Sequence, residues 1–185
     1  MLTLNFEPFP TITTDRLVLR KLKDSDAPEI FILRSDERIL QFIDIAKANS
    51  IGDALAFIHK INNFINENKS MYWGIASKDD DKLIGTICFW NILEDHYRAE
   101  VGFAMHPNHQ GKGLMSEALA AVVNYAFNDV KLHSLEGRVH PSNTASIKLM
   151  ERNKFIREAY FKEDYFFNGK FGDTAVYSLL SEVEA

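Results

Sequence analysis

One stretch near the middle of the chain decides how the rest is arranged. It reads Glu100-Val-Gly-Phe-Ala-Met105, then His106-Pro-Asn-His-Gln-Gly-Lys-Gly-Leu-Met-Ser116, then an alanine-rich apolar segment that ends at Phe127. Apolar residues alternate with small ones in the first part, which predicts a β-strand that Pro107 ends. In the last part the apolar positions recur at helical spacing: Ala118, Leu119, Val122, Val123, Ala126 and Phe127. The stretch predicts a strand, a glycine loop and a helix that opens at Ser116 or just before it.

The glycine loop has the properties of an anion-binding site. Gly111 and Gly113 let a ligand approach the backbone without obstruction by Cβ atoms, and the start of a helix presents unpaired N–H groups and a positive dipole end. The loop is not a dinucleotide fingerprint, because Ser116 stands where the third glycine belongs, and it is not a P-loop, because no Gly-Lys-Ser/Thr follows a four-residue spacer. The structural alternative is a tight strand-to-helix turn with no ligand.

Length and composition indicate an ordinary globular protein. The 185 residues, 46% of them hydrophobic and 25% charged, predict a single domain over residues 1–185 with a sizeable core. A formal charge of −5, with the basic residues scattered, argues against a nucleic-acid-binding surface. No run approaches the length of a membrane helix and the first ten residues lack a signal-peptide pattern. We therefore expect a cytoplasmic protein with no membrane partner.

Neither cysteine chemistry nor a metal is expected. The single cysteine, Cys88, lies in an apolar run, which favours a buried core thiol over a nucleophile and fits a reducing compartment. His106 and His109 lack a matching pair of histidines or cysteines, so no metal site is predicted.

The rest of the chain alternates strand and helix patterns. Strands are expected at 14–22, 71–77, 83–92, 99–105, 134–140, 155–167 and 174–180, and helices at 26–33, about 50–66, 116–127 and 145–152. Asp26-Ala-Pro-Glu29 predicts a capped helix start, with the stripe of the next helix at Ile51, Leu55, Ile58, Ile61 and Ile65. Asn168-Gly169 predicts a hairpin turn. The order indicates an α/β fold with helices inserted in a mainly antiparallel sheet.

Gln110-Gly-Lys-Gly-Leu-Met115, preceded by a strand and His-Pro, resembles the Gln/Arg-x-x-Gly-x-Gly/Ala signature of the GNAT acetyltransferase superfamily, with Met115 in place of a small residue. The element order, the opening Thr14-Asp-Arg-Leu-Val-Leu-Arg20 and the ending Asp173-Thr-Ala-Val-Tyr-Ser-Leu-Leu180 are similar to the branch of Rim enzymes, which acetylate N-termini of ribosomal proteins. The resemblance covers about residues 13–180. It implies a GNAT fold with a twisted sheet of about seven strands and about four helices.

The resemblance also implies a cofactor site. In the family, amides of the loop hold the pyrophosphate of acetyl-CoA, and amides at the end of the preceding strand hold the pantetheine and polarise the thioester carbonyl. The matching cofactor-binding positions are Phe103, Ala104, Met105, Gln110, Gly111, Lys112, Gly113, Leu114, Met115, Ser116 and Asn143. Asn143 is also a natural helix N-cap. Acetyl-CoA is the expected co-substrate, with no metal.

Two side chains are candidates for proton transfer. Glu100 matches the position of a family carboxylate near the acceptor amine, where it would act as general base, directly or through water; the alternative is a glutamate in a surface ion pair. Many family members carry a tyrosine acid two helical turns after the asparagine, and here Met150 occupies that place. Either Ser146 assists the leaving thiolate, or no dedicated acid is needed because a thiolate is already a fair leaving group. After this helix, Asn153 tolerates a left-handed backbone, so the turn into the next strand stays possible.

The interpretation that follows is an acetyl-CoA-dependent N-acetyltransferase that acts on a primary amine. The expected acceptor is a protein N-terminal α-amine of the ribosomal-protein type, ahead of a small-molecule amine, and the chain is expected to be a monomer or a homodimer. Two other classes stay open: a non-catalytic acyl-CoA-binding module, to which Met115 and Met150 would point, and a dinucleotide-binding oxidoreductase.

Overall fold

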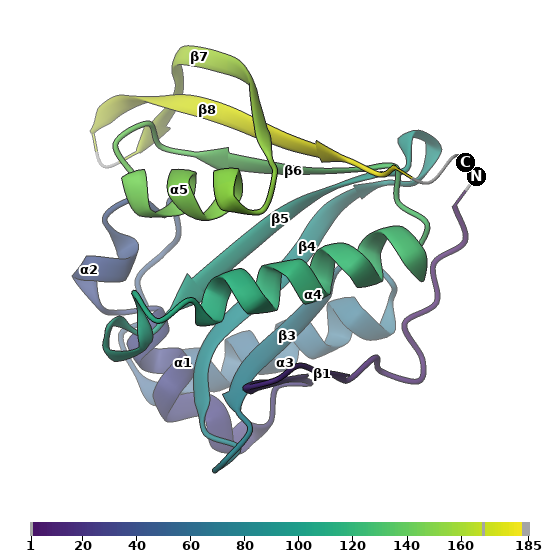
Figure 1. The fold of residues 1–185 in the computed structure, drawn as a ribbon. Coiled ribbons are helices and arrows are strands. Elements are labelled where there is room, and N and C mark those ends of the chain that lie inside the picture. The colour runs from purple at the N-terminus through teal and green to yellow at the C-terminus, as the bar shows by residue number, and fades with distance from the viewer. Residues whose placement is uncertain (1, 168, 183–185) are drawn as a thin grey trace.

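A computed structural model describes residues 2–167 and 169–182. Its centre is an eight-stranded sheet in the order β1-β2-β3-β4-β5-β6-β8-β7 (Figure 1). The strands are β1 (Ile12–Thr13), β2 (Leu17–Arg20), β3 (Met71–Ser77), β4 (Leu83–Leu93), β5 (Arg98–Met105), β6 (Ser134–Val139), β7 (Ile156–Phe167) and β8 (Lys170–Leu180). All the strand patterns expected from the sequence are present, and the short β1 is an addition.

Helices cover both faces of the sheet. They are α1 (Ala27–Leu33), α2 (Glu37–Leu40), α3 (Ile51–Asn66), α4 (Leu114–Asn128) and α5 (Thr144–Arg152), with 3-10 turns η1 (Asp24–Asp26), η2 (Glu94–His96) and η3 (Pro107–His109). Figure 1 shows α4 crossing the front of the sheet and α1 and α3 packed behind it. The sequence did not predict α2, because four residues are too short to show helical periodicity. No helix in the described part of the chain is both long and apolar enough to span a bilayer.

The pairing of β5 with β6 is what opens the sheet. It is the parallel pair of this otherwise antiparallel sheet, and its register runs from Arg98↔Ser134 to Glu100↔Glu136 and then stops. On its other side β5 stays paired with β4 as far as Met105. Figure 1 shows β5 and β6 diverging beyond their shared start, with α5 at the open side. The backbone groups of the second half of β5 that point toward β6 therefore have no ladder partner from that strand.

The predicted apolar stripe of α3 is confirmed over most of its length. Ile58, Ile61 and Ile65 are buried, and Ala54 takes the inward position one turn earlier. Ile51 lies in the first turn and stays 46% exposed, because the stripe reaches the core only from the second turn onward. Ser50 and Asp53 form a reciprocal capping box that fixes where the helix begins.

The predicted capping role of Asp26 is wrong. The Asp26 carboxylate makes no cap hydrogen bond to α1 but points back to β2, where both of its oxygens accept from the Arg20 guanidinium at 2.8 and 2.9 Å. Both side chains are buried, and Arg20 also donates to Asp81 of the β3–β4 loop at 2.6 Å. A buried arginine needs anionic partners more than a helix needs a cap, so the long-range ion pair prevails over the local signal.

The predicted C-terminal hairpin is present, since β7 and β8 pair antiparallel through Phe167↔Lys170. Asn168 of the predicted turn lies outside the described residues, and Gly169 has a φ of 77°. At the end of α5, Asn153 does not take the left-handed conformation that it tolerates. It ends the helix with a φ of −93°, and Lys154 is left-handed instead, at 67°. The amide side chain of Asn153 is used to bind the helix carbonyl of Leu149 at 2.8 Å.

Replacing Lys154 with glycine is expected to stabilise the protein. A left-handed backbone costs a residue with a Cβ about 1 to 2 kcal/mol, and glycine removes this cost while losing part of the gain to unfolded-state entropy. We expect a net gain of about 0.5 to 1 kcal/mol in the free energy of unfolding, measured by urea denaturation. Lys148→Gly, inside α5, is the matched control and should destabilise by about 1 kcal/mol. Destabilisation by both variants would contradict the assignment of strain to Lys154.

Candidate active site

The glycine loop has the conformation that its glycines require. Gly111 and Gly113 have φ values of 74° and 75°, and Gly113 is the N-cap of α4. No neighbouring atom comes within 4 Å of the place a Cβ would occupy at Gly111, so conformation rather than crowding demands glycine here. Both glycines are exposed, and the free N–H groups of the first turn of α4 face the same open loop. The geometry is suited to an anion.

The loop is fixed to the end of β5 by its own side chains and backbone. Gln110 donates a hydrogen bond from Nε2 to the carbonyl of Met105 at 3.0 Å, which ties the loop to the last residue of the strand. The His106 N–H donates to the Ile84 carbonyl at 2.9 Å and extends the sheet by one bond. Lys112, between the glycines, is exposed.

A brace from the N-terminal region holds the other end of the loop. Arg16 donates from Nη1 to the Lys112 carbonyl at 3.0 Å and from Nε to Glu117 of α4 at 2.7 Å. The hydroxyl of Thr14 donates to the same Glu117 carboxylate at 2.6 Å. These three residues were not identified from the sequence, because Arg16 and Glu117 are 101 positions apart and no local pattern links them.

The first turn of α4 also connects to α5. Leu114 and Met115 are half-buried and pack on the main core, so the methionine that replaces a small residue is accommodated as an apolar contact. The hydroxyl of Ser116 accepts a hydrogen bond from Asn153 Nδ2 at 3.0 Å. Ser116 was expected at the cofactor site; in the structure its oxygen joins the start of α4 to the end of α5.

The strand edge predicted to hold the pantetheine lies where β5 and β6 separate. Phe103, Ala104 and Met105 pair with β4 on one side, and the register with β6 has ended by Glu100. Phe103 and Ala104 are half-buried and Met105 is buried. Backbone N–H groups on the β6 side are thus fixed in direction by a well-paired strand, which is the arrangement that can polarise a carbonyl.

Glu100 lies at the point of divergence. It stands opposite Trp90 of β4 and Glu136 of β6 and is half-buried. Burial raises the pKa of its carboxyl, and the neighbouring Glu136 carboxylate raises it further, whereas Arg138 and a hydrogen bond from Asn91 oppose the shift. Both guanidinium groups nearby, those of Arg98 and Arg138, pair with Glu136. Among the described residues Glu100 has no ion pair within 4 Å, and its side chain is half-buried rather than fully exposed.

Asn143 and Ser146 open α5 on the other side of the divergence. The Asn143 side-chain oxygen accepts from the Ser146 N–H at 3.1 Å, so Asn143 is the N-cap. Among the described residues, no hydrogen-bond partner meets the Asn143 amide nitrogen or the Ser146 hydroxyl, so both remain able to bind a ligand. Met150 is 1% exposed and packs over Gly137, where it can transfer no proton.

Aromatic residues and the cysteine near β5 separate into core and surface positions. Trp73 and Phe89 are fully buried, whereas Trp90, next to Glu100 across the strands, is 48% exposed. Burial raises the pKa of the Cys88 thiol to about 12, so it stays protonated at neutral pH and does not act as a nucleophile. No group of three or more metal-ligating side chains gathers in the part of the chain that the structure describes.

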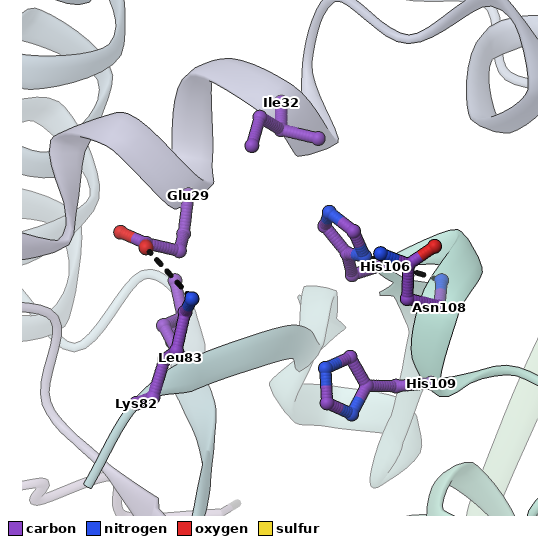
Figure 2. A pocket seen from close by; sticks show the side chains of 7 residues that line it. All are labelled: Glu29, Ile32, Lys82, Leu83, His106, Asn108 and His109. Carbon is purple, nitrogen blue, oxygen red and sulfur yellow. Dashed lines mark hydrogen bonds and ion pairs between the residues drawn. The ribbon is translucent and has the colours of Figure 1, made fainter.

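A small cavity of about 150 Å³ lies beside the loop, between α1, the start of β4 and η3. Figure 2 shows His106, Asn108 and His109 lining it from the loop side, facing Glu29 and Ile32 of α1. Burial lowers the pKa of His109, and the positive charge of Lys112 adds to this effect. The cavity is lined by none of the predicted site residues.

Comparison with known proteins decides the family. The family model of the acetyltransferase (GNAT) domain matches residues 16–156, most of the chain. The chain belongs to the GNAT acetyltransferase family. It is 34% identical over 176 residues to the uncharacterized N-acetyltransferase YoaA of Bacillus subtilis, and the match covers 95% of this chain and 99% of that protein. The resemblance inferred from the glycine loop and the element order is thereby confirmed.

Two GNAT relatives carry more specific names. The [ribosomal protein uS5]-alanine N-acetyltransferase of Escherichia coli is 29% identical over 177 residues, which is 93% of this chain and 91% of that enzyme. The structure of spermidine N-acetyltransferase from Vibrio cholerae, in complex with CoA and spermine, is 26% identical with a TM-score of 0.79 and covers 90% and 96% of the two chains. Family members thus bind CoA, and this GNAT chain is an N-acetyltransferase; its expected acceptor is a separate question.

Glu117→Gln is expected to destabilise the protein in a pH-dependent way. Burial raises the pKa of the Glu117 carboxyl, but hydrogen bonds from Thr14 and Arg16 outweigh it and leave the pKa below its usual value. A depressed folded-state pKa means that the carboxylate stabilises the fold above the unfolded-state value of about 4.3, and that this contribution is lost as the pH falls through the lower folded-state pKa.

The free energy of unfolding of wild type and variant, measured by urea denaturation from pH 7 down to about pH 3, should therefore converge at acid pH. Glu151→Gln, an exposed glutamate of α5, is the control and should run parallel to wild type. If the wild type remained more stable than the variant by the same free energy of unfolding at every pH, the charge of Glu117 would not be what stabilises its contacts with Thr14 and Arg16.

Proposed function

We propose that this GNAT enzyme transfers the acetyl group of acetyl-CoA to the α-amine of a protein N-terminus. The observation that carries the proposal is the position of Glu100, a half-buried carboxylate with a raised pKa at the point where β5 leaves β6. It lies at the start of the same strand whose far end leads into the glycine loop. Strand β5 therefore carries a candidate base at its start and leads, at its other end, into the loop that would bind acetyl-CoA.

The donor would lie along β5 and the loop. The pyrophosphate fits the N–H groups around Gly111, Gly113 and the start of α4, where a helix terminus and exposed backbone donors favour an anion. The pantetheine amides fit the β6-facing backbone groups of residues 103–105, which lack strand partners on that side. Asn143, whose amide nitrogen is free among the described residues, fits a contact near the thioester from the β6 side.

Transfer then needs a neutral amine and a polarised carbonyl. Glu100 takes a proton from the incoming ammonium, directly or through water, and the amine attacks the thioester carbonyl carbon. Backbone N–H groups of β5 stabilise the oxyanion that forms. When it collapses, the C–N bond has formed and the C–S bond breaks, so CoA leaves as a thiolate. The attacking nitrogen gives its second proton to water or to the thiolate, which leaves a neutral amide.

The CoA thiolate can leave without a dedicated proton donor. A thiol of ordinary pKa, about 8.5, leaves as an anion that water can protonate. Ser146, half-buried in the first turn of α5, is the one hydroxyl of the predicted site placed to assist, and Met150 provides none. The absence of a tyrosine acid is therefore compatible with turnover.

The choice of an α-amine acceptor is supported by the E. coli uS5-alanine acetyltransferase relative and by acid-base chemistry. A free α-amine has a pKa of about 7.7 to 8.0 in water, against about 10.4 for a lysine-type amine. A single weakly basic carboxylate therefore deprotonates an α-ammonium group more readily than a lysine-type ammonium group. Spermidine is the competing acceptor, because an enzyme with that name has a similar structure.

The acceptor is tested by incubating the purified protein with radiolabelled acetyl-CoA and two matched panels. One panel holds peptides with different free N-terminal residues, beginning with alanine, each beside its N-acetylated form; the other holds spermidine and spermine. We expect label on free N-termini and none on the blocked peptides. Preferential labelling of polyamines would replace the proposed acceptor, and stabilisation by CoA without any transfer would favour a non-catalytic module.

Glu100→Gln is expected to lower kcat/KM and to remove the part of its pH dependence that comes from ionisation of the Glu100 carboxyl. In the wild type the base works only when ionised, so kcat/KM should fall as the pH drops through a value above the ordinary glutamate pKa of about 4.3. Loss of the base should reduce turnover on the order of 10²-fold for lysine-type amines and less for α-amines. Glu158→Gln, exposed on β7, is the control. Equal and negligible effects on both acceptors would remove Glu100 from this role.

A further inference from the structure

An aromatic contact spans the open end of the divergence between β5 and β6. Phe42, in the connection between α2 and α3, stacks its ring on that of His140, with the centroids 5.6 Å apart and the planes inclined by 29°. His140 is the residue that follows the end of β6. Both side chains are half-buried. The stack therefore links a helix connection to the strand that leaves β5.

The connection that carries Phe42 is anchored on the β5 side of the gap. Ile43 packs on the core that α1, α3 and the start of β4 share. The Ala48 N–H donates a hydrogen bond to the carbonyl of Arg34, the C-cap of α1, at 2.8 Å. The Phe42 ring therefore reaches across the gap, from the part of the fold that supports β5 to the end of β6.

Strand geometry gives the size of this gap. Pairing of β5 with β6 ends at Glu100 and Glu136, and His140 lies four residues farther along β6, which at 3.3 Å per residue is about 13 Å. Met105, at the end of β5, lies five residues beyond Glu100, or about 17 Å. The opening thus has a closed end at Glu100, and the Phe42–His140 stack bridges the strands near its other end.

The two faces of the opening differ in what borders them. Figure 1 shows α4 and α5 in front of the sheet, and their N-terminal ends, at Gly113 and Asn143, border the front face, where the donor would bind. On the other face Ala104 of β5 packs against the core of α1 and α3. A donor on the front face leaves the rear face for the acceptor amine. Phe42 borders that route, because its connection runs between α2 and α3 on the rear side.

We propose that Phe42 is a specificity-determining residue for the acceptor. By stacking on His140 it closes the far end of the opening, so that only an amine carried by a narrow chain end reaches the thioester. A first residue as small as alanine passes, whereas a bulky first residue meets the aromatic ring. This role takes a protein N-terminus as the acceptor and therefore rests on the proposed function.

Phe42→Ala removes the ring and should widen the range of acceptors. Wild type and variant are compared by kcat/KM on peptides that differ only in the first residue, which is alanine or phenylalanine. The ratio for phenylalanine over alanine should rise on the order of tenfold in Phe42→Ala, because a steric limit in a pocket is of this size. Phe42→Tyr keeps the ring and should keep the wild-type ratio. Phe64→Ala, which removes a half-buried phenylalanine of α3, is the matched control and should not change it.

His140→Asn tests the other partner of the stack. The Nδ1 atom of His140 accepts a hydrogen bond from the Ser142 N–H at 3.1 Å, and asparagine can accept the same bond from two residues on. The turn that leads to Asn143 should therefore persist while the ring is lost, and the Kd for CoA should stay within about twofold of wild type. His140→Asn should relax selectivity as Phe42→Ala does. The double variant should add little to either single change, because each removes the same contact.

The stack can also be measured without turnover. Diethyl pyrocarbonate modifies accessible imidazole rings, and mass spectrometry gives the rate at each histidine. The Phe42 ring should slow modification of His140 relative to the exposed His133. Phe42→Ala should raise the His140 rate severalfold, whereas Phe64→Ala should leave it unchanged.

Unchanged peptide selectivity in Phe42→Ala and His140→Asn, in an enzyme that acetylates the alanine peptide, would overturn the proposal. A His140 modification rate that Phe42→Ala does not raise would overturn it as well. If the wild type acetylates no peptide at all, the proposed function fails and the role of Phe42 fails with it. That outcome is distinct from an active enzyme whose selectivity does not depend on the stack.

Discussion

The divergence of β5 and β6 is the constraint on which the rest of the molecule depends. Parallel strands cannot be joined by a tight turn, so the chain must cross between them, and it does so through the glycine loop and α4. Because pairing stops at Glu100, the second half of β5 presents backbone donors and acceptors that a ligand can satisfy. The candidate site therefore consists mainly of backbone, held by the ladder to β4 on the opposite side.

An open site of this kind must be rigid before the ligand arrives, since ordering a loop upon binding would lower affinity. The loop is tied at three points: to β5 by Gln110, to the segment before β2 by Arg16 and Glu117, and to α5 by the Ser116–Asn153 hydrogen bond. The last two ties connect elements that are far apart in sequence. The first turn of α4 is thereby fixed relative to β5, to the segment before β2 and to α5.

This contrast between local and distant interactions separates what the sequence could predict from what it could not. The glycine conformations, the Asn143 cap and the strand pattern are set by neighbours within a few residues, and all are found as expected. The Asp26 cap was predicted by local rules and proved wrong, because Arg20 of β2 binds the same carboxylate. The Arg16–Glu117 brace and the register shift of β4 beside Glu100 depend on tertiary packing and strand pairing, which no spacing in the sequence reveals.

The packing over β6 leaves an apolar side chain, which can donate no proton, at position 150. A Cβ at Gly137 would meet the Met150 sulfur at 2.5 Å, so glycine on β6 makes the space that the buried methionine fills. The reaction tolerates this because a thiolate departs without prior protonation, whereas an ammonium cannot attack until it has lost a proton. Transfer to an amine therefore demands a base more than an acid, and a buried apolar residue at position 150 is compatible with that demand.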